Sequence, residues 1–478
     1  MFTGAAWAIG MRWCMRLIGL VSVVILARLL TPADFGLVAM ATLVIALIDS
    51  FSEFGTEMML MRQAEATRAQ CDTAWSFRII QGAITAVVIL AAAPFASRYF
   101  NDSRLVGVMA VLAVVAVVGS AGNIGMTLIR RELKFATDFR FGLYVKLANF
   151  FPTLALAYVL RDYWALVLGN LVGAVVGVII SYRMHPYRPR FSLAMHREYL
   201  AFSVDVVASN IARLLKNKVD VLVLGGVAGP SVTGQYNVAS ELARMGTQEI
   251  VIPAWRGLFP SFASLKSDHS RFIAAYLNLV AGIATFCLPL GIGLSVLAVN
   301  LIPALLGSQW TAAVVPMQWL SLAAALLALS DTFGGNILFV SGHQRRAAVL
   351  LWVHLLLQGG AVFAASRIGG MNEFAQATAL VSALMVPISA VVVTRSLGLS
   401  AWALVGAVWR PFAAAVVMGL VIHAASLTAV ESNLAQLVLR GMLGIATYVG
   451  AAGLLWVACK RPTGVEQMIV EWLAARLT

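Results

Sequence analysis

Charged residues are scarce in this sequence. Only 12% of its 478 residues are Asp, Glu, Lys or Arg, whereas 61% are hydrophobic, and the mean hydropathy is +0.88. An ordinary soluble domain carries about 25% charged residues, so water alone cannot be the solvent for this surface. Many of the apolar stretches approach roughly 20 residues, the length that crosses the hydrocarbon core. The chain is therefore predicted to be an integral membrane protein that works in or across the lipid bilayer.

Motifs for several other functions are also missing. No Walker loop GxxxxGK[ST] is present, which argues against ATP hydrolysis. No connection between apolar stretches is long enough for a soluble catalytic domain. The four cysteines have neither CxxC nor Cys/His spacing, which argues against a disulfide framework and a metal site, and they are Cys14, Cys71, Cys287 and Cys459. No cofactor is expected.

The apolar stretches predict an all-α polytopic membrane protein with fourteen transmembrane helices. Twelve spans are the alternative, because the seventh and eighth stretches are polar and residues 296–310 could form a re-entrant segment. Arg12 and Arg16 precede an apolar run without a cleavage site, so the first stretch is interpreted as an uncleaved span. The predicted spans are 3–27, 36–58, 75–98, 104–127, 138–160, 163–184, 199–226, 232–258, 273–296, 310–335, 347–366, 372–394, 403–426 and 433–459.

The net charge of +13 would suggest nucleic acid in a soluble protein. Here the basic residues have a topological meaning, and no nucleic-acid partner is expected. With the N-terminus in the cytoplasm, the inner loops and the tail hold nineteen Lys and Arg residues. The outer loops hold five, which are Arg28, Arg98, Arg104, Arg161 and Arg367. The positive-inside rule therefore places both termini in the cytoplasm.

A short motif occurs twice. Pro32-x-x-x-Gly36 separates the first two spans, and Pro230-x-x-x-Gly234 separates the seventh and eighth, 198 residues later. Six spans lie between the copies, so the halves are predicted to be parallel repeats. The predicted organisation is a six-helix lobe over 1–198, a second over 199–395, an extra helix pair over 396–459 and an amphipathic cytoplasmic tail over 460–478. The tail has apolar residues at helical spacing, which are Val465, Met468, Ile469, Trp472 and Leu473.

Charges within the spans concentrate on the first two helices of each predicted lobe. A charge at the bilayer centre is costly and normally faces a partner or water. The cations are Arg12, Arg16, Arg213, Lys216 and Arg244, with Lys146 in the fifth span. The carboxylates are Asp49, Glu53, Asp205, Asp220 and Glu241.

Two interpretations of these charges remain open. In the first, they line a water-filled cavity whose cations bind an anionic group, most naturally a phosphate. In the second, they pair between helices, for example Arg16 with Glu53 or Lys216 with Glu241. The carboxylates could instead bind Na⁺ or exchange H⁺ to drive transport.

The first 65 residues carry a family resemblance. The segment from Arg16 to Gly36, with Ala27-Arg28-Leu29-Leu30-Thr31-Pro32, and the continuation Phe51-Ser52-Glu53-Phe54-Gly55 resemble bacterial oligosaccharide flippases. These are the Wzx-type members of the MOP exporter superfamily. The resemblance implies two six-helix lobes around a cationic cavity, with Arg12, Arg16, Arg213 and Lys216 as candidates to contact a diphosphate.

The function implied by this resemblance is transport and not catalysis. The expected cargo is an undecaprenyl-diphosphate-linked oligosaccharide, moved from the cytoplasmic to the periplasmic leaflet of the inner membrane for surface polysaccharides such as lipopolysaccharide or exopolysaccharide. Polysaccharide polymerase and assembly proteins are further expected partners. The alternatives are a flippase for the peptidoglycan lipid precursor, a multidrug exporter of the same superfamily and, in another class, a membrane polysaccharide polymerase or ligase.

Overall fold

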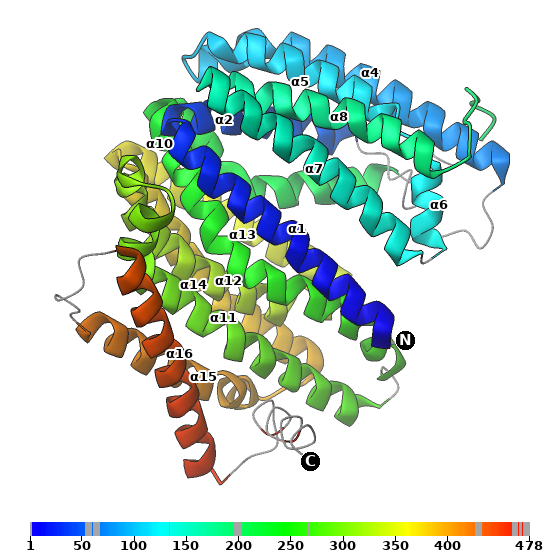
Figure 1. The fold of residues 1–478 in the computed structure, drawn as a ribbon. Helices are drawn as coiled ribbons and strands as arrows, with labels where there is room; N and C mark the ends of the chain where they lie inside the picture. The colour runs from blue at the N-terminus through cyan, green and yellow to red at the C-terminus, as the bar shows by residue number, and fades with distance from the viewer. Residues whose placement is uncertain are drawn as a thin grey trace. The chain divides into compact units, whose positions relative to one another are not determined.

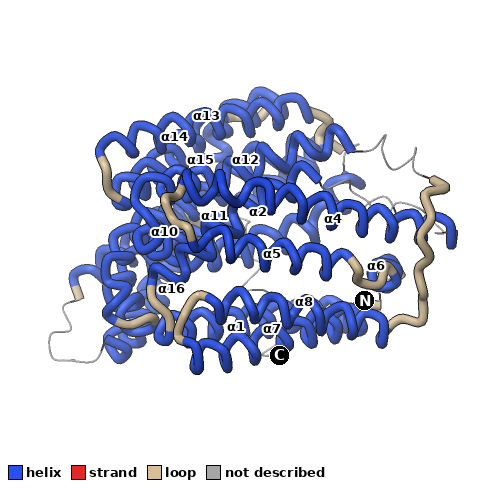
Figure 2. The backbone as a smooth tube through the Cα atoms, turned by 90° about the horizontal axis from the view of Figure 1, so that it is seen from above, coloured by secondary structure: helices blue, strands red, loops and turns tan. Residues whose placement is uncertain are grey.

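The computed structural model describes residues 2–52, 60, 67–132, 134–195, 203–265, 268–425 and 433–460, together with 467 and 471. Within these ranges every regular element is a helix and none is a strand (Figure 2). The predicted all-α fold is therefore confirmed. The apolar positions of the predicted tail helix lie outside the described residues.

Each of the fourteen predicted spans falls on a helix (Figure 1). The earlier helices are α1 (Phe2–Leu29), α2 (Pro32–Ser52), α4 (Arg68–Tyr99), α5 (Arg104–Ser120), the short α6 (Gly125–Arg131), α7 (Phe135–Leu160), α8 (Trp164–Met184) and α10 (Ser203–Ser264). The later helices are α11 (His269–Leu305), α12 (Val314–Val340), α13 (Gln344–Ile368), α14 (Met371–Leu397), α15 (Ala401–Ala424) and α16 (Asn433–Ala458).

Three of the predicted spans do not form separate straight helices. The seventh and eighth predicted spans form one helical segment, α10, which is interrupted at Gly229 by a backbone φ of 76°. The fourth span is divided between α5 and α6, which bend by 63° at their junction. Residues 296–305, considered as a re-entrant segment, continue α11 and are followed by a 3-10 turn over Ser308–Ala313.

Helices α1 and α10 carry several of the cations noted in the sequence. Among the described residues, ten helices are long and apolar enough to cross a membrane, or eleven if the bent α5–α6 pair is counted as one span. A charge within a membrane helix normally faces protein or water instead of lipid.

The chain forms two compact units, residues Met1–Gly234 and Gln235–Thr478. The core of the first unit lies between α2, α4 and α5, where Leu37, Met40 and Ile89 are fully buried. The core of the second lies between α11, α12 and α14, around Tyr276 and Met385. The predicted lobe boundary at residue 198 stays a prediction.

Glycines set the packing of α7 on α8. A Cβ atom at Gly169 would overlap Thr153, one at Gly173 would lie 3.0 Å from Asn149, and one at Gly177 would lie 3.4 Å from Val145. These contacts step by four residues along both helices, in opposite directions, so one face of α8 lies directly on α7. Small residues at four-residue spacing allow such close approach between membrane helices.

The segment that follows α8 is held against the first unit by polar groups. The Asn123 amide donates to the carbonyl oxygens of His185 and Tyr187 at 3.2 and 2.8 Å. The buried Asp72 carboxylate accepts from the Tyr187 hydroxyl at 2.7 Å and from the backbone N–H of Arg190 at 2.8 Å. Burial and this carboxylate raise the pKa of Tyr187 above its usual value, so its hydroxyl remains a donor.

We predict that Gly169→Ala destabilises the first unit by about 1–3 kcal/mol, the usual cost of overpacking. The new methyl group would lie 2.9 Å from Thr153 Cα, a backbone atom that cannot rotate away. Thermal unfolding in detergent, followed by size-exclusion chromatography, measures the loss. Gly119→Ala is the matched control, because nothing lies within 4 Å of that Cβ position. Equal stability of the two variants would show that the α7–α8 contact is not tight.

Candidate functional site

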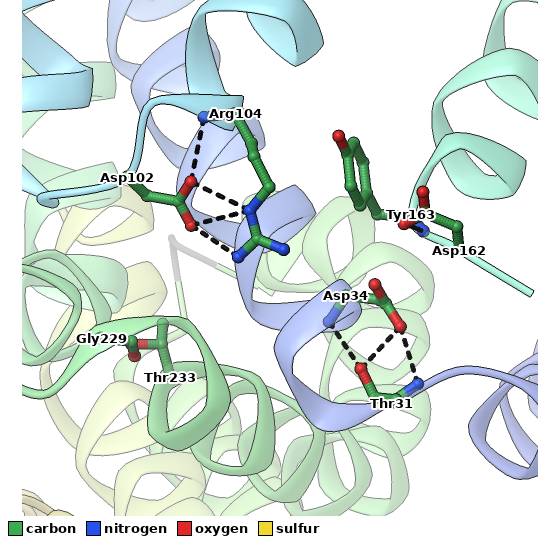
Figure 3. A network of polar contacts seen from close by, with 8 residues as sticks. All are labelled: Thr31, Asp34, Asp102, Arg104, Asp162, Tyr163, Gly229 and Thr233. Atoms are coloured by element: carbon green, nitrogen blue, oxygen red, sulfur yellow. Dashed lines mark hydrogen bonds and ion pairs between the residues drawn. The ribbon is translucent and has the colours of Figure 1, made fainter.

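The first copy of the Pro-x-x-x-Gly motif begins α2. Thr31 is the residue before the helix, and its N–H and hydroxyl donate to Asp34 Oδ2 at 2.8 and 2.6 Å. The Asp34 N–H donates back to the Thr31 hydroxyl at 3.3 Å. This is a reciprocal capping box, and Pro32 occupies the first helical position, where a missing N–H costs nothing. The turn between α1 and α2 is therefore fixed by local chemistry (Figure 3).

The second copy interrupts α10 by a different device. Gly229 adopts a φ of 76°, a conformation that L side chains rarely adopt, and Pro230 follows it directly. The Thr233 hydroxyl donates to the Gly229 carbonyl oxygen at 2.8 Å (Figure 3). The second Pro-x-x-x-Gly motif therefore begins a new helical part of α10 directly after the break, without a separate loop.

The two copies contact one another within the first unit. A Cβ atom at Gly36 would overlap the Pro230 carbonyl oxygen, and one at Gly234 would overlap the Pro32 carbonyl oxygen. The same two positions lie 2.9 Å from the Gly234 nitrogen and 2.8 Å from the Gly36 nitrogen, respectively. Each motif therefore touches the other through the same atoms. We call this contact the glycine clasp, formed by Pro32, Gly36, Pro230 and Gly234.

Two further glycines hold α10 at the same end of the unit. A Cβ atom at Gly225 would lie 2.7 Å from the Phe100 ring, and one at Gly226 would lie 2.8 Å from the Tyr99 ring. The Tyr99 hydroxyl donates to the Leu222 carbonyl oxygen at 3.4 Å. Helix α10 therefore packs against the end of α4 as well as against the start of α2.

Several polar side chains lie near this end of the first unit. Arg104, at the start of α5, forms a bidentate interaction with Asp102, with Nη2 to Oδ2 at 2.7 Å. These hydrogen bonds hold the pKa of Asp102 below its usual value. The Arg104 guanidinium also lies 5.6 Å from the centre of the Tyr163 ring, and the capped turn at Asp34 is nearby (Figure 3).

The predicted cations of the first unit lie on α1 and α10. Arg16 is partly buried on α1, with its Nε atom shielded from solvent. On α10, Arg213 is exposed and forms no hydrogen bond or ion pair with the described part of the chain, whereas Lys216 is partly buried and has a partner. The side chain of Arg12, also on α1, lies outside the described residues.

The predicted carboxylates are less uniform. Asp49 is exposed on α2, while Asp220 is 2% exposed on α10 and accepts from the Val221 N–H at 2.8 Å. Glu53 and the side chain of Asp205 lie outside the described residues. The role of Asp220 in ion coupling or pairing within a cavity stays a prediction. Among the described residues no three His, Cys, Asp or Glu side chains are grouped to bind a metal.

Glu241 and Arg244 belong to the second unit. They lie three residues apart on the later part of α10, with Glu241 exposed and Arg244 partly buried. Residues three apart share one helix face, so these two charges are placed together. Whether they join the charges of the first unit stays a prediction.

Sequence analysis missed two cations in the second unit. Arg410 on α15 is only 9% exposed, and Arg440 on α16 donates to Asn300 Oδ1 at 3.1 Å. Asn300 in turn donates to Gln436 at 2.9 Å, which links α11 to α16. Both arginines could have been identified from the sequence, because each of them interrupts an apolar stretch. Arg440 therefore helps to hold α16 to α11, and Arg410 also has a partner in the structure.

Comparison with known proteins gives a family match. Residues 25–315, more than half of the chain, match a family model described as "Polysaccharide biosynthesis protein". The lipopolysaccharide biosynthesis protein WzxC of Escherichia coli is 25% identical over 70% of this chain and 69% of its own length. The teichuronic acid biosynthesis protein TuaB of Bacillus subtilis is 24% identical over 96% and 95%, respectively. The succinoglycan biosynthesis transport protein ExoT of Rhizobium meliloti is 24% identical over 70% and 68%.

Two solved structures share the fold. The inward closed conformation of the lipid II flippase MurJ aligns with a TM-score of 0.77 over 96% of this chain and all of its own, at 11% identity. An inward-facing multidrug transporter of the MATE family, in the MOP superfamily, aligns with a TM-score of 0.60 over 80% of this chain and 94% of its own, at 14% identity. At these identities the likeness establishes the shared all-α membrane-protein fold alone.

Proposed function

Because the chain belongs to the family of polysaccharide biosynthesis proteins, we propose that it is a flippase for an undecaprenyl-diphosphate-linked oligosaccharide. The cargo moves from the cytoplasmic to the periplasmic leaflet of a bacterial inner membrane. One observation carries the proposal: the cations Arg16 and Arg213 lie on α1 and α10, within spans predicted from the sequence, in a chain that has this family and fold.

An anionic cargo explains the exposed Arg213 better than structural pairing does, whereas Arg16 also has a partner within the protein. A cation in the hydrocarbon region is costly unless it meets a partner or water. Arg213 is exposed and without a described partner, ten residues after the start of α10 and sixteen before its break at Gly229. Sixteen residues of helix extend about 24 Å, so the side chain is far from that end. A planar guanidinium suits the oxygens of a phosphoryl group.

The orientation follows from the basic loops. The positive-inside rule places both termini in the cytoplasm, and the glycine clasp then lies at the periplasmic end. Alternating access requires the cargo to leave at that end, so the clasp must separate during each cycle. It consists of backbone contacts between two short motifs and contains no ion pair. Such a contact breaks without exposing an unpaired charge.

Two other cargoes remain alternatives. The fold is shared with a lipid II flippase and with a multidrug transporter, so fold alone does not select among them. The family match favours a polysaccharide precursor over both. A drug cation would suit an acidic cavity, whereas the exposed Arg213 is basic. Binding of undecaprenyl diphosphate carrying a glycan, compared with lipid II and with an organic cation, separates the three.

We expect Arg16→Ala and Arg213→Ala each to reduce transport of undecaprenyl-diphosphate-linked oligosaccharide in proteoliposomes. A charge-assisted hydrogen bond contributes about 1.5–3 kcal/mol, so the apparent affinity should fall by about tenfold or more. Arg395→Ala is the matched control, since Arg395 is an exposed arginine in the last turn of α14. Full transport in both test variants would contradict capture of the diphosphate by these cations.

We expect Gly36→Ala to open the periplasmic end, because the added methyl group would overlap a backbone carbonyl. The readout is Arg213→Cys in a chain whose native cysteines are changed to Ser, labelled with a membrane-impermeant maleimide. In the parent protein, labelling should occur in inverted vesicles and not in spheroplasts. Gly36→Ala and Gly234→Ala should both add labelling in spheroplasts.

Gly360→Ala is the control for these variants, because its Cβ position has no neighbour within 4 Å. If labelling in spheroplasts is the same in Gly36→Ala, Gly234→Ala and the parent, the clasp does not close the periplasmic end.

A further inference from the structure

Lys146 lies on the face of α7 that contacts α1. A Cβ atom at Gly142 would lie 2.7 Å from the Met15 methyl group, and one at Gly19 would lie 3.8 Å from Lys146 Nζ. Both pairs are separated by 127 residues, so α1 and α7 run parallel in a fixed register (Figure 1). This register places the Lys146 ammonium directly over the glycine of α1.

The position of Lys146 is close to the middle of the bilayer. It lies eleven residues after the start of α7 and fourteen before its end. At 1.5 Å per residue these distances are about 17 and 21 Å, in a hydrocarbon core about 30 Å thick. Lysines near helix ends extend to the interface, but a central lysine is too far from either one to do so.

Among the described residues, Lys146 has no counter-charge on the helices that pack around it. It is partly buried and forms no hydrogen bond or ion pair with the described part of the chain. Helices α1 and α8 contain no acidic residue, and the one acidic residue of α7, Asp138, is paired with Arg130 at 2.8 Å. An intramembrane charge in such a setting is a functional group by default.

A second cation lies on the same seam. Arg16 precedes Gly19 by three residues, and residues three apart share one helix face. Arg16, which is partly buried, therefore lies on α1 within one helical turn of the glycine next to the Lys146 ammonium. Two cations from neighbouring helices match a ligand with two adjacent phosphoryl groups better than a ligand with one.

We propose that Lys146 is a ligand-binding residue that, with Arg16, recognises the second phosphoryl group of a diphosphate. The proposal rests on the proposed function, because it assigns a further residue to the same cargo. Lysine provides a mobile point charge, while arginine provides the planar fork. The glycine at position 19 leaves the ammonium uncovered on the α1 side. In this proposal Lys146 determines the preference for a diphosphate over a monophosphate.

The test uses the full chain in nanodiscs with undecaprenyl diphosphate, undecaprenyl monophosphate, undecaprenol and inorganic pyrophosphate as probes. The wild-type protein should prefer the lipid diphosphate to the lipid monophosphate. Lys146→Met should weaken diphosphate binding by about tenfold or more and bring it to the level of the monophosphate. Lys146→Arg, which keeps the charge, should restore most of the preference.

Lys134→Met is the matched control, because Lys134 is an exposed lysine that pairs with Glu132 between α6 and α7. Thermal stability is the second readout. Removal of an unpaired charge should leave the melting temperature of Lys146→Met unchanged or raise it, whereas loss of a structural ion pair would lower it. A lowered melting temperature together with unchanged lipid selectivity would assign Lys146 a structural role and overturn the proposal.

The outcomes separate this inference from the proposed function. If Lys146→Met retains the diphosphate preference while Arg213→Ala loses affinity, the inference fails and the flippase proposal stands. If the wild-type protein binds undecaprenol as well as undecaprenyl diphosphate, both fail. If inorganic pyrophosphate competes as strongly as the lipid and depends on Lys146, the diphosphate site stands, but a free anion replaces the lipid headgroup as its ligand.

Discussion

Helices in a hydrocarbon core gain little by burying apolar surface, because the lipid is as apolar as their own side chains. Each helix already satisfies its own backbone groups, so specificity must come from close packing. This chain obtains close packing with glycine at two places in the first unit. Gly169, Gly173 and Gly177 bring α8 onto α7, and Gly36 and Gly234 bring α2 onto α10. The positions of the charged helices depend on these contacts.

The two glycine contacts serve different purposes. The α7–α8 seam extends over three successive helical turns and includes a hydrogen bond between Asn149 and Asn170 at 2.8 Å. A contact of that length makes α7 and α8 one rigid pair, and Lys146 is carried on it. The glycine clasp is confined to one turn of each helix. A short contact of backbone atoms is a suitable place for reversible separation, because little surface is lost when it opens.

The same chemical rule divides the membrane-embedded cations into two groups. Arg440 is partly buried and donates to Asn300, and a cation that bonds to an amide of a neighbouring helix holds the two helices together. Arg213 and Lys146 have no such partner among the described residues. A folded protein retains an unsatisfied intramembrane charge only where water or a ligand reaches it. Whether a cation has a partner is therefore a better guide to the proposed binding site than its position in the sequence.

Hydropathy predicted the helices well, because the thickness of the bilayer fixes how long a span must be. The span predicted at 403–426, for instance, is α15, Ala401–Ala424. It could not show whether residues 296–305 form a re-entrant segment or continue α11, because an apolar stretch is compatible with both. The Pro-x-x-x-Gly repeat was visible in the sequence, but the contact between its copies was not, because a spacing does not say which backbones meet. The candidate cations were likewise visible, whereas only coordinates distinguish a paired arginine from an unpaired one.

The two motifs of the glycine clasp contact each other through the same atoms, and this symmetry matters for the direction of the proposed transport. Each motif presents its glycine to the proline carbonyl of the other, so opening changes the same atoms on both sides and favours neither. A carrier whose closed contact is symmetric, and whose cations bind the cargo equally in both orientations, equilibrates the cargo between leaflets. The local structures that begin the two motifs do differ, with a capped turn at Thr31 and a positive φ at Gly229. That asymmetry sets how each helix starts and not how strongly the cargo is held. If the protein acts as the proposed flippase, net export requires an ion gradient or consumption of the cargo after its release.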